Sequence, residues 1–434
     1  MGRHLEEAAA LGDRLAGAAL WHGDRCNWFG RAKGTGTRDG LPAARPMEPS
    51  FYSGTAGIAW FLAHLADKTG EPRHRATAEG AARHALRHAR ALDPTAASDD
   101  LARRDLGGRL RGGYYIGSLG VAWVGWTLGT RWGQQDLRRG ALAVLEGLDL
   151  DGPAPFEDDL VFGSAGAIPA LLQMEDQGCP GAGALAHRLA LRVARAAGRR
   201  EDGAWTWTPP HWNSGSEPLT GWSHGASGFA WGLACAWSAF KDEEFRAGAL
   251  GALAYERSVY DAQANVWPDF QLREEDGSPG RRRTWCHGAP GIGLARVLVG
   301  RLIDARELRE EARLARRATL EELQERLPVP GLDFAPCCGL AGLAEVLWLL
   351  DEALGLDGGH GRARAVADWG IARFGREARA ASAGIADWPT AAAAGFHPSL
   401  LTGLAGIGHF LLRLEDPARV PTVLAPGPAT GPAP

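Results

Sequence analysis

Apolar and polar stretches alternate along the chain in a pattern that returns seven times. Each repeat opens with a cluster of glycine and small residues, continues into a run that is apolar nearly all round, and ends in an amphipathic segment. The first glycines of the clusters stand at positions 54, 117, 163, 225, 288, 339 and 403, between 46 and 64 residues apart. Each interval is long enough for two helices, so the pattern predicts seven helix pairs.

The two kinds of segment predict helices with different surroundings. Runs such as 58–62 and 229–233 are apolar around the whole helix, which is typical of helices buried on several sides. The amphipathic segments have one apolar face and are expected to be covered on one side only. They are predicted at 3–20, 71–91, 131–147, 183–199, 241–259, 303–326 and 361–376.

A double ring satisfies both classes, with seven buried helices inside and seven amphipathic helices outside. We therefore predict an all-α fold, an α/α toroid, formed by residues 1–415 as a single domain. Because every glycine cluster begins an inner helix, the seven turns, numbered one to seven along the chain, should meet at one end of the ring. The Pro- and Ala-rich residues 416–434 show no periodicity, and we expect them to be disordered.

Composition narrows the function classes. The net charge of -4 gives no sign of a nucleic-acid or membrane-surface partner. The first residues are polar and no run of 18 apolar residues lacks a charge, so we expect neither a signal peptide nor a membrane segment, and a cytoplasmic location. In that reducing compartment the six cysteines should be thiols or metal ligands.

Two irregular stretches interrupt the repeat. Residues 93–112 are charged and contain glycine, which is typical of an exposed loop. Residues 201–222 are rich in aromatic side chains, and they either line a groove or pack on the outer ring. The tryptophans of this stretch are Trp205, Trp207, Trp212 and Trp222.

Half of the cysteines lie on two of the turns. Cys286 belongs to the fifth turn, and the adjacent Cys337 and Cys338 belong to the sixth. These thiols can offer three soft ligands to Zn²⁺ and leave the fourth tetrahedral position open, as in catalytic zinc sites. The competing interpretation is packing, because free cysteines are often buried, but the repeat brings both turns to the same end and favours a metal site. For the other cysteines we predict packing: Cys26, Cys179 and Cys235.

Neighbouring turns add groups that suit proton transfer. Asp159 lies on the third turn, His224 on the fourth and His287 on the fifth. A carboxylate, an imidazole and a metal in one pocket can activate a nucleophile and move a proton. Three thiolate ligands favour activation of a thiol over activation of water, since zinc hydrolases more often use histidine or carboxylate ligands.

Three motifs are the most distinctive in the chain: Trp285-Cys286-His287-Gly288, Cys337-Cys338-Gly339 and Gly221-Trp222-Ser223-His224-Gly225. With the seven glycine turns, from about 50 to 415, the chain resembles the lanthionine synthetase C-like family, the lanthipeptide cyclases. The resemblance implies an α/α toroid with a catalytic zinc. It also implies that a peptide cysteine thiol is added to dehydroalanine or dehydrobutyrine, which closes a lanthionine or methyllanthionine thioether ring.

On the matching positions, the resemblance implies that Cys286, Cys337 and Cys338 bind the zinc ion. Most members have histidine at the position of Cys338, and this chain is similar to a subset whose third ligand is also cysteine.

The resemblance implies catalytic roles for four further residues. His224 matches the acid–base histidine of the family, and Asp159 matches the acidic residue beside it. Arg282 matches an arginine that assists stabilisation of the enolate, and His287 stands where many members have histidine or tyrosine.

The implied substrate is a dehydrated precursor peptide. We expect a separate dehydratase, or a kinase and lyase, to prepare it, because the toroid leaves no room for such a region.

Two alternatives stay open: addition of a small thiol such as glutathione to dehydroamino acids, and a non-catalytic zinc-containing binding protein. A groove lined by the tryptophans of 201–222 would favour a peptide substrate, and an anion pocket near residues 281–283 would favour a small thiol. A glycosidase of the same architecture would need two facing carboxylates, whereas Asp158 and Asp159 lie on one turn.

Overall fold

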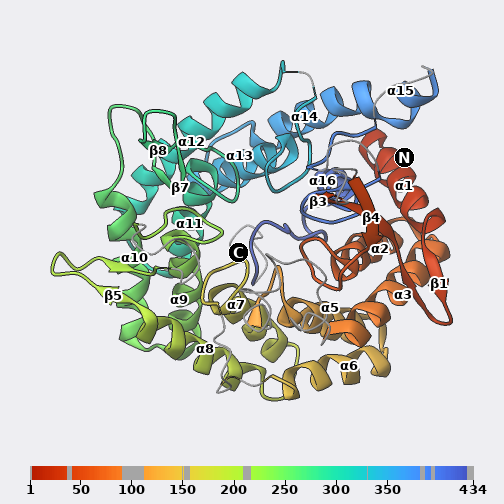
Figure 1. The fold of residues 1–434 in the computed structure, drawn as a ribbon, viewed down its shortest axis with the longest axis horizontal. Helices are drawn as coiled ribbons and strands as arrows, with labels where there is room; N and C mark the ends of the chain where they lie inside the picture. Colours follow the sequence, from red (N-terminus) through yellow and green to blue (C-terminus); the bar gives the residue numbers. More distant parts are fainter. Residues whose placement is uncertain are drawn as a thin grey trace.

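Two rings of helices, one inside the other, make up the computed structural model (Figure 1). It describes residues 2–36, 42–89, 112–148, 150, 157–208, 217–329, 331–381, 387–391 and 396–427. The predicted α/α toroid is confirmed. Most of the predicted loop 93–112 lies outside the described residues.

In the part of the chain that the structure describes, seven helices form the inner ring. They are α2 (Thr55–Thr69), α5 (Ser118–Trp132), α7 (Ser164–Asp176), α9 (Ala226–Phe240), α11 (Ala289–Leu302), α13 (Leu340–Leu354) and α16 (Leu404–Glu415). Each begins at its glycine cluster. Because these helices are apolar all round, they are buried on every side, and residues 226–236 of α9 are buried without interruption.

The outer ring contains seven amphipathic helices among the described residues. They are α1 (Arg3–Gly17), α3 (Pro72–His88), α6 (Gln135–Glu146), α8 (Ala182–Ala196), α10 (Glu243–Ser258), α12 (Glu307–Arg326) and α14 (Gly359–Phe374). In α8 the buried residues Ala186, Leu189, Ala190 and Val193 form the stripe expected of a helix covered on one face. A short helix, α15 (Arg376–Ala381), follows α14.

Each inner helix packs against the outer helix that follows it, and α1 packs against α16, which closes the ring. The first and last helices are also joined by a hydrogen bond of 2.8 Å between His4 Nδ1 and Glu415 Oε1. The first helix, α1, therefore belongs to the outer ring, and its inner-ring partner is the last helix, α16.

In the described ranges, four two-stranded antiparallel ribbons lie in the connections between helices. They are β1 (Leu20–His22) with β2 (Arg25–Asn27), β3 (Phe29–Gly36) with β4 (Pro42–Pro46), β5 (Gly198–Arg199) with β6 (Trp205–Thr206), and β7 (Asp269–Arg273) with β8 (Pro279–Gly280). Most of these strands are too short to show a period of two in the sequence, so the pattern did not predict them.

The glycine turns repeat because the second glycine of each cluster has no room for a side chain. A Cβ atom there would lie only 1.7 to 2.3 Å from the carbonyl oxygen of the residue six positions earlier. This close approach occurs at all seven clusters: at Gly57, Gly120, Gly166, Gly228, Gly291, Gly342 and Gly406. The sequence repeat is thus a repeat of one backbone geometry.

The turns meet at one end of the ring, as predicted, and main-chain hydrogen bonds join neighbouring turns. The N–H to O=C pairs are Tyr52 to Tyr115 at 2.8 Å, Ile116 to Val161 at 3.0 Å, Val161 to Ser223 at 3.2 Å, Ser223 to Cys286 at 3.1 Å, Cys337 to Leu401 at 2.8 Å and Leu401 to Tyr52 at 2.9 Å. Among the described residues, the joint between the fifth and sixth turns has no such bond. We call it the open joint.

The prediction that residues 416–434 are disordered is wrong for 416–427. After α16 the chain runs toward the centre of the ring (Figure 1), and Val420, Val423 and Leu424 are at most 2% exposed. The segment is held by hydrogen bonds to its backbone carbonyls, which need no periodic side-chain pattern and therefore leave no sign in the sequence. Residues 428–434 lie outside the described residues.

Candidate metal centre

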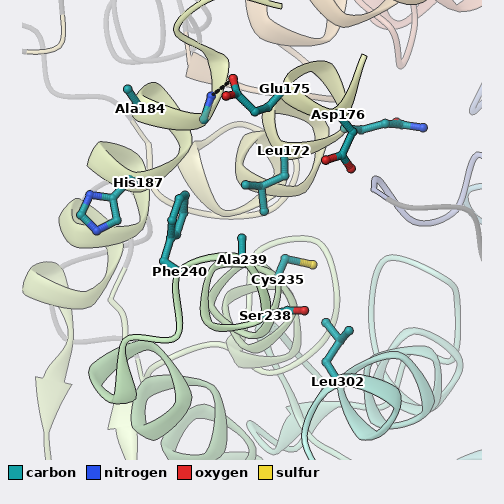
Figure 2. A pocket seen from close by; sticks show the side chains of 12 residues that line it. Leu172, Glu175, Asp176, Ala184, His187, Cys235, Ser238, Ala239, Phe240 and Leu302 are labelled. Atoms are coloured by element: carbon teal, nitrogen blue, oxygen red, sulfur yellow. Dashed lines mark hydrogen bonds between the residues drawn. The ribbon is translucent and has the colours of Figure 1, made fainter. Parts of the chain in front are cut away.

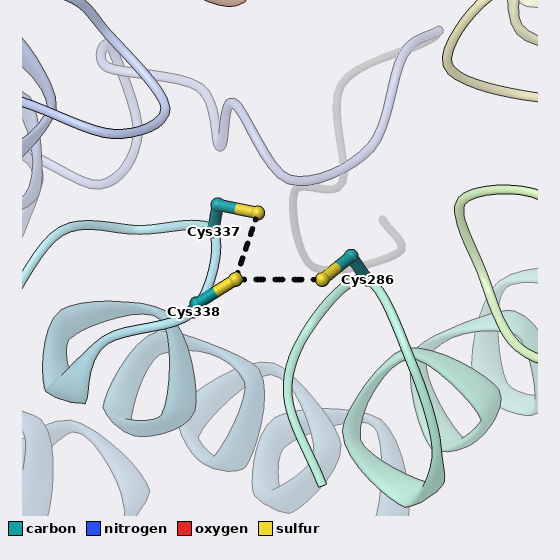
Figure 3. Close-up of side chains that lie close together, drawn as sticks. All are labelled: Cys286, Cys337 and Cys338. Atoms are coloured by element: carbon teal, nitrogen blue, oxygen red, sulfur yellow. Dashed lines mark hydrogen bonds between the residues drawn. The ribbon is translucent and has the colours of Figure 1, made fainter. Parts of the chain in front are cut away.

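Three thiols meet at the open joint (Figure 3). The Sγ atoms of Cys286 and Cys338 are 3.5 Å apart, those of Cys337 and Cys338 are 3.4 Å apart, and all three lie within 4.8 Å of one another. Cys286 comes from the turn before α11, and the other two come from the turn before α13. Within the described ranges this is the single group of three histidine, cysteine or acidic side chains with metal-ligand geometry, so these thiols could hold a metal ion.

The thiols share charge through their hydrogen bonds. Hydrogen bonds from Cys337 and Cys338 lower the pKa of Cys286 well below its ordinary value. The same contacts raise the pKa of Cys337, and the hydrogen bond with Cys286 is the main cause that raises the pKa of Cys338 to about 12. Cys286 is therefore the first of the three to become a thiolate.

The other cysteines lie apart from this cluster and are buried, as predicted. Burial raises the pKa of Cys26 to about 12 and that of Cys179 to about 11, and it raises the pKa of Cys235 as well. Their thiols are neutral packing groups.

Two hydroxyl groups contact the cluster, and no sequence motif predicts either of them. The Tyr52 hydroxyl donates a hydrogen bond of 2.8 Å to Cys337 Sγ, and Thr284 Oγ1 lies 3.2 Å from Cys286 Sγ. Tyr52 belongs to the first turn, so a contact across the ring places it beside the sixth. Hydrogen bonds of this kind orient ligand atoms and tune their charge.

His224 and Asp159 form a hydrogen-bonded pair across the third and fourth turns. His224 Nδ1 lies 2.8 Å from Asp159 Oδ2, and the carboxylate is almost fully buried. The backbone N–H of Phe162 donates to Asp159 Oδ1 at 2.6 Å, and the Phe162 ring stacks on the imidazole with a centroid distance of 4.8 Å. The carboxylate holds the imidazole proton on Nδ1 and leaves Nε2 as the nitrogen that can exchange a proton.

The histidine turn and the cysteine turn are in direct contact. Both the backbone N–H and the hydroxyl of Ser223 donate to the carbonyl oxygen of Cys286, at 3.1 and 2.9 Å. The rings of His224 and His287 lie 5.9 Å apart. The structure thus brings the predicted acid–base residue beside the predicted ligand.

A further carboxylate, which the sequence analysis missed, holds Arg282 and His287. Arg282 Nε donates to Asp269 Oδ2 on β7, and Arg282 Nη2 donates to Gln271 Oε1 at 3.1 Å. His287 Nδ1 lies 3.9 Å from the same Asp269 oxygen. Asp269 lies 17 residues before Cys286 in an irregular stretch, so no local motif marks it.

Burial controls the charge of His287. Burial, followed by the nearby Arg282 guanidinium, lowers the pKa of His287 to about 3, so its imidazole is neutral at pH 7. The turn that carries it depends on Gly288, whose φ is +82° and whose Cβ would lie 2.0 Å from the carbonyl oxygen of Arg282. No side chain fits there.

Comparisons with known proteins show the family of this chain. The chain matches the family described as "Lanthionine synthetase C-like protein" over residues 45–425. The chain belongs to the lanthionine synthetase C-like family. The resemblance predicted from the three motifs is confirmed.

Solved structures with the same fold include nisin cyclase. Its TM-score to this lanthionine synthetase C-like protein is 0.59 at 17% sequence identity, over 86% of this chain and 90% of that chain. A cellobiose 2-epimerase from Spirochaeta thermophila DSM 6192 has a TM-score of 0.49 at 14% identity, over 96% of both chains. An unsaturated glucuronyl hydrolase from Bacillus sp. GL1 has a TM-score of 0.48 at 12% identity, over 96% of this chain and 98% of that chain. No curated protein is significantly similar in sequence.

In the described part of the aromatic stretch 201–222 of this lanthionine synthetase C-like protein, two tryptophans pack on the helices. Trp205 and Trp207 are 8% and 5% exposed, and the Trp207 ring stacks on Phe229 at 4.4 Å. The interpretation that these two tryptophans line a groove is wrong, because their rings fill the space between helices. Trp212 lies outside the described residues.

A cavity of about 840 Å³ lies at the C-terminal ends of inner helices of this lanthionine synthetase C-like protein, opposite the glycine turns. Figure 2 shows the side chains that line it. Residues near the ends of α7, α9 and α11 line it, including Glu175, Asp176 and Phe240. None of the predicted site residues is among them, so the cavity is separate from the thiols. No helix in the described ranges has the length and apolarity needed to span a bilayer.

Proposed function

We propose that this protein is a zinc-dependent lanthipeptide cyclase. It would add peptide cysteine thiols to dehydroalanine or dehydrobutyrine and so form lanthionine or methyllanthionine rings. The observation that carries the proposal is that the turn of His224, which is paired with Asp159, is hydrogen-bonded through Ser223 to the turn of Cys286, one of the three clustered thiols. Membership of the lanthionine synthetase C-like family supports it.

The donor set suits zinc. A tetrahedral zinc ion with Zn–S bonds of about 2.3 Å separates its sulfur ligands by about 3.8 Å. The two Sγ separations of 3.4 and 3.5 Å require little movement to reach that value. Three soft ligands also leave one coordination position for a substrate sulfur.

Zinc bound to Cys286, Cys337 and Cys338 would lower the pKa of a peptide thiol in its fourth coordination position, and it would supply that sulfur as a thiolate near pH 7. The protein residues would then do the positioning. Tyr52 and Thr284 orient two of the ligand sulfurs through their hydroxyl groups. This arrangement suits thiol addition better than hydrolysis.

The proposed reaction adds S–H across a C=C bond. The sulfur electron pair forms the C–S bond to the β-carbon, and the π electrons move to the α-carbon and its carbonyl as an enolate. His224, protonated on Nε2, gives a proton to the α-carbon and is restored by the proton that the substrate thiol releases. Asp159 holds His224 in the tautomer and orientation that this transfer needs.

His287 and Arg282 are proposed to act on the enolate. A neutral His287 can donate an N–H hydrogen bond to the developing oxyanion without requiring a buried charge. Asp269 and Gln271 fix the Arg282 guanidinium and offset part of its charge. The substrate would be a peptide dehydrated by a separate dehydratase, or by a kinase and lyase.

The test begins with metal analysis of the wild-type protein and of Cys338→Ala and Cys338→His. Cyclisation of a dehydrated, cysteine-containing peptide is followed in parallel by thiol alkylation and mass spectrometry. We expect near-stoichiometric zinc in the wild type, loss of zinc and of ring formation in Cys338→Ala, and retention of both in Cys338→His. A wild-type protein without zinc, or an unchanged zinc content in Cys338→Ala, would contradict the proposed site.

The same assay separates the two alternatives. If the protein attaches glutathione to the dehydroamino acid and the cysteine of the peptide stays free, the small-thiol alternative is correct. If zinc is bound but neither thiol reacts, the protein is a zinc-containing binding protein.

A further inference from the structure

The chain after α16 fills the interior of the ring with a short uncharged segment. Residues 422–426 are all buried, although none belongs to a helix or strand. A buried backbone without regular structure must find other partners for its polar groups. Here the partners are aromatic side chains.

Four aromatic donors contact the carbonyl oxygens of three residues in this segment. The Leu424 oxygen accepts hydrogen bonds from the indole N–H groups of both Trp222, at 3.0 Å, and Trp285, at 2.8 Å. The Val423 oxygen accepts from the Tyr115 hydroxyl at 2.9 Å, and the Pro426 oxygen accepts from the Trp231 indole at 2.9 Å. The segment therefore contacts the second, fourth and fifth turns and α9.

Two of these donors lie next to the proposed site. Trp285 directly precedes Cys286, and Trp222 stands two residues before His224. Both indoles donate to a single oxygen atom, so their distance from one another is limited by that shared acceptor. The turns that carry the metal ligand and the acid–base histidine are thus held from inside the ring as well as by Ser223.

We propose that residues 422–427, which we call the strap, are a positioning element that sets the cysteine turn against the histidine turn. The strap does not touch the thiols or the imidazole, and it acts through the two tryptophans. Its effect on catalysis rests on the proposed function and its effect on zinc release rests on the proposed zinc ion, whereas its effect on the position of Cys286 rests on neither.

Burial of a tryptophan in this protein does not by itself require a hydrogen bond from its indole N–H, so the indole bonds to the segment 422–426 need another reason. Trp126 is 1% exposed, yet its indole N–H has no hydrogen-bond partner among the described residues. Burial of an indole in this ring is therefore compatible with an unpaired N–H. Trp126 also offers a matched control, because Trp126→Phe removes a buried N–H that donates no hydrogen bond to the described residues.

The first experiment compares a chain that ends at Pro421 with a chain that ends at Gly427, which keeps the strap. Two readouts are used: the rate of zinc release to a chelator, and the rate of Cys286 alkylation in the chelator-treated protein, followed by mass spectrometry. We expect the chain ending at Gly427 to match the full chain. The chain ending at Pro421 should release zinc about 10-fold faster or more, and its Cys286 should be alkylated faster.

The second experiment keeps the whole chain and so covers the case in which the shorter chain does not fold. Trp285→Phe should speed zinc release and Cys286 alkylation about 5-fold, the equivalent of one lost hydrogen bond. Trp222→Phe should leave zinc release unchanged and lower kcat about 5-fold, with little change in KM. Trp126→Phe should change none of these.

Equal effects of Trp285→Phe and Trp126→Phe on alkylation would overturn the strap proposal. The same conclusion follows if the two shortened chains release zinc alike. If no variant or wild-type protein forms rings, the proposed function fails, but the alkylation rates still decide whether the strap positions Cys286.

Discussion

Single side chains at the candidate metal centre divide into the thiols that could bind a metal ion and the groups that orient those thiols. Tyr52 belongs to the second kind, because its hydroxyl donates to Cys337 Sγ while the Tyr52 backbone joins the first turn to the second and seventh. A residue distant in sequence thus orients a thiol of the sixth turn. The sequence analysis predicted the three cysteines from their turns, but it could not predict Tyr52, since only closure of the ring brings the first turn to the sixth.

Removal of the Tyr52 hydroxyl should weaken metal binding. Tyr52→Phe keeps the ring and loses the hydrogen bond to sulfur, so we expect the zinc affinity to fall about 10-fold, as for other groups that orient metal ligands. Competition with a chelator measures it. Tyr260→Phe is the control, because the Tyr260 hydroxyl donates to Asn265 Oδ1 at 2.7 Å and not to a thiol. Equal affinities of the two variants would contradict this role.

Two adjacent carboxylates allow a sharp test of the proton-transfer pair. Asp159→Asn should cut kcat for cyclisation by about 100-fold or more without loss of zinc, because the amide no longer fixes the His224 tautomer. Asp158→Asn is the matched control, since Asp158 bonds Arg192 and Ser164 instead. A loss of activity in Asp158→Asn as large as in Asp159→Asn would count against the assignment.

At the scale of elements, the turns form a chain of main-chain hydrogen bonds that, among the residues the structure describes, is interrupted once. The interruption falls between the turns before α11 and α13, where three thiols stand in place of an N–H to O=C pair (Figure 3). The sequence predicted that the turns would meet, because each glycine cluster begins an inner helix. It did not predict the hydrogen bonds between the turns or the position of the open joint, because both depend on how neighbouring helix pairs pack against each other.

Metal removal should loosen the open joint before any other. We expect amide hydrogen exchange at 284–288 and 333–339 to rise at least about 10-fold in chelator-treated protein, because bonds from a metal ion to the three thiols would be the direct link between these turns. Exchange at Tyr52 and Val161, whose amides bond across neighbouring turns, should change little. A uniform rise at all turns would mean that the metal stabilises the whole ring, and no change would mean that it does not bridge the joint.

At the scale of the whole molecule, buried histidines inside the inner ring make the fold sensitive to acid. Burial lowers the pKa of His64 to about 3, and the nearby Arg131 adds to this effect. Burial also lowers the pKa of His409, which lies beside His64, well below its ordinary value. The unfolded chain takes up protons below about pH 6.5, whereas folded His64 stays neutral until about pH 3. The stability that depends on a neutral His64 is therefore fully present above pH 6.5, and it is lost as the pH falls from about 6.5 to about 3.

His64→Gln should reduce that acid sensitivity. In the wild type, His64 alone contributes up to about 1.4 kcal/mol of lost stability per pH unit below pH 6.5. Urea unfolding at pH 7.0, 6.0 and 5.0 should therefore show a smaller decrease in the variant, although its stability at pH 7.0 is lower. Parallel pH profiles for the two proteins would show that His64 is already protonated or solvated in the folded state.

The sequence by itself determined the repeat, the two classes of helix, the shared end of the seven turns, and the cysteines and histidines that gather there. It could do so because helix periodicity and close backbone approach at glycine are local properties, written in residues a few positions apart. Tertiary structure alone decided the partners of those residues: Tyr52 on Cys337, Asp269 on Arg282, and the burial of 422–426. These contacts join segments whose distance depends on closure of the whole ring, and the strap is held by backbone carbonyls, which every sequence has.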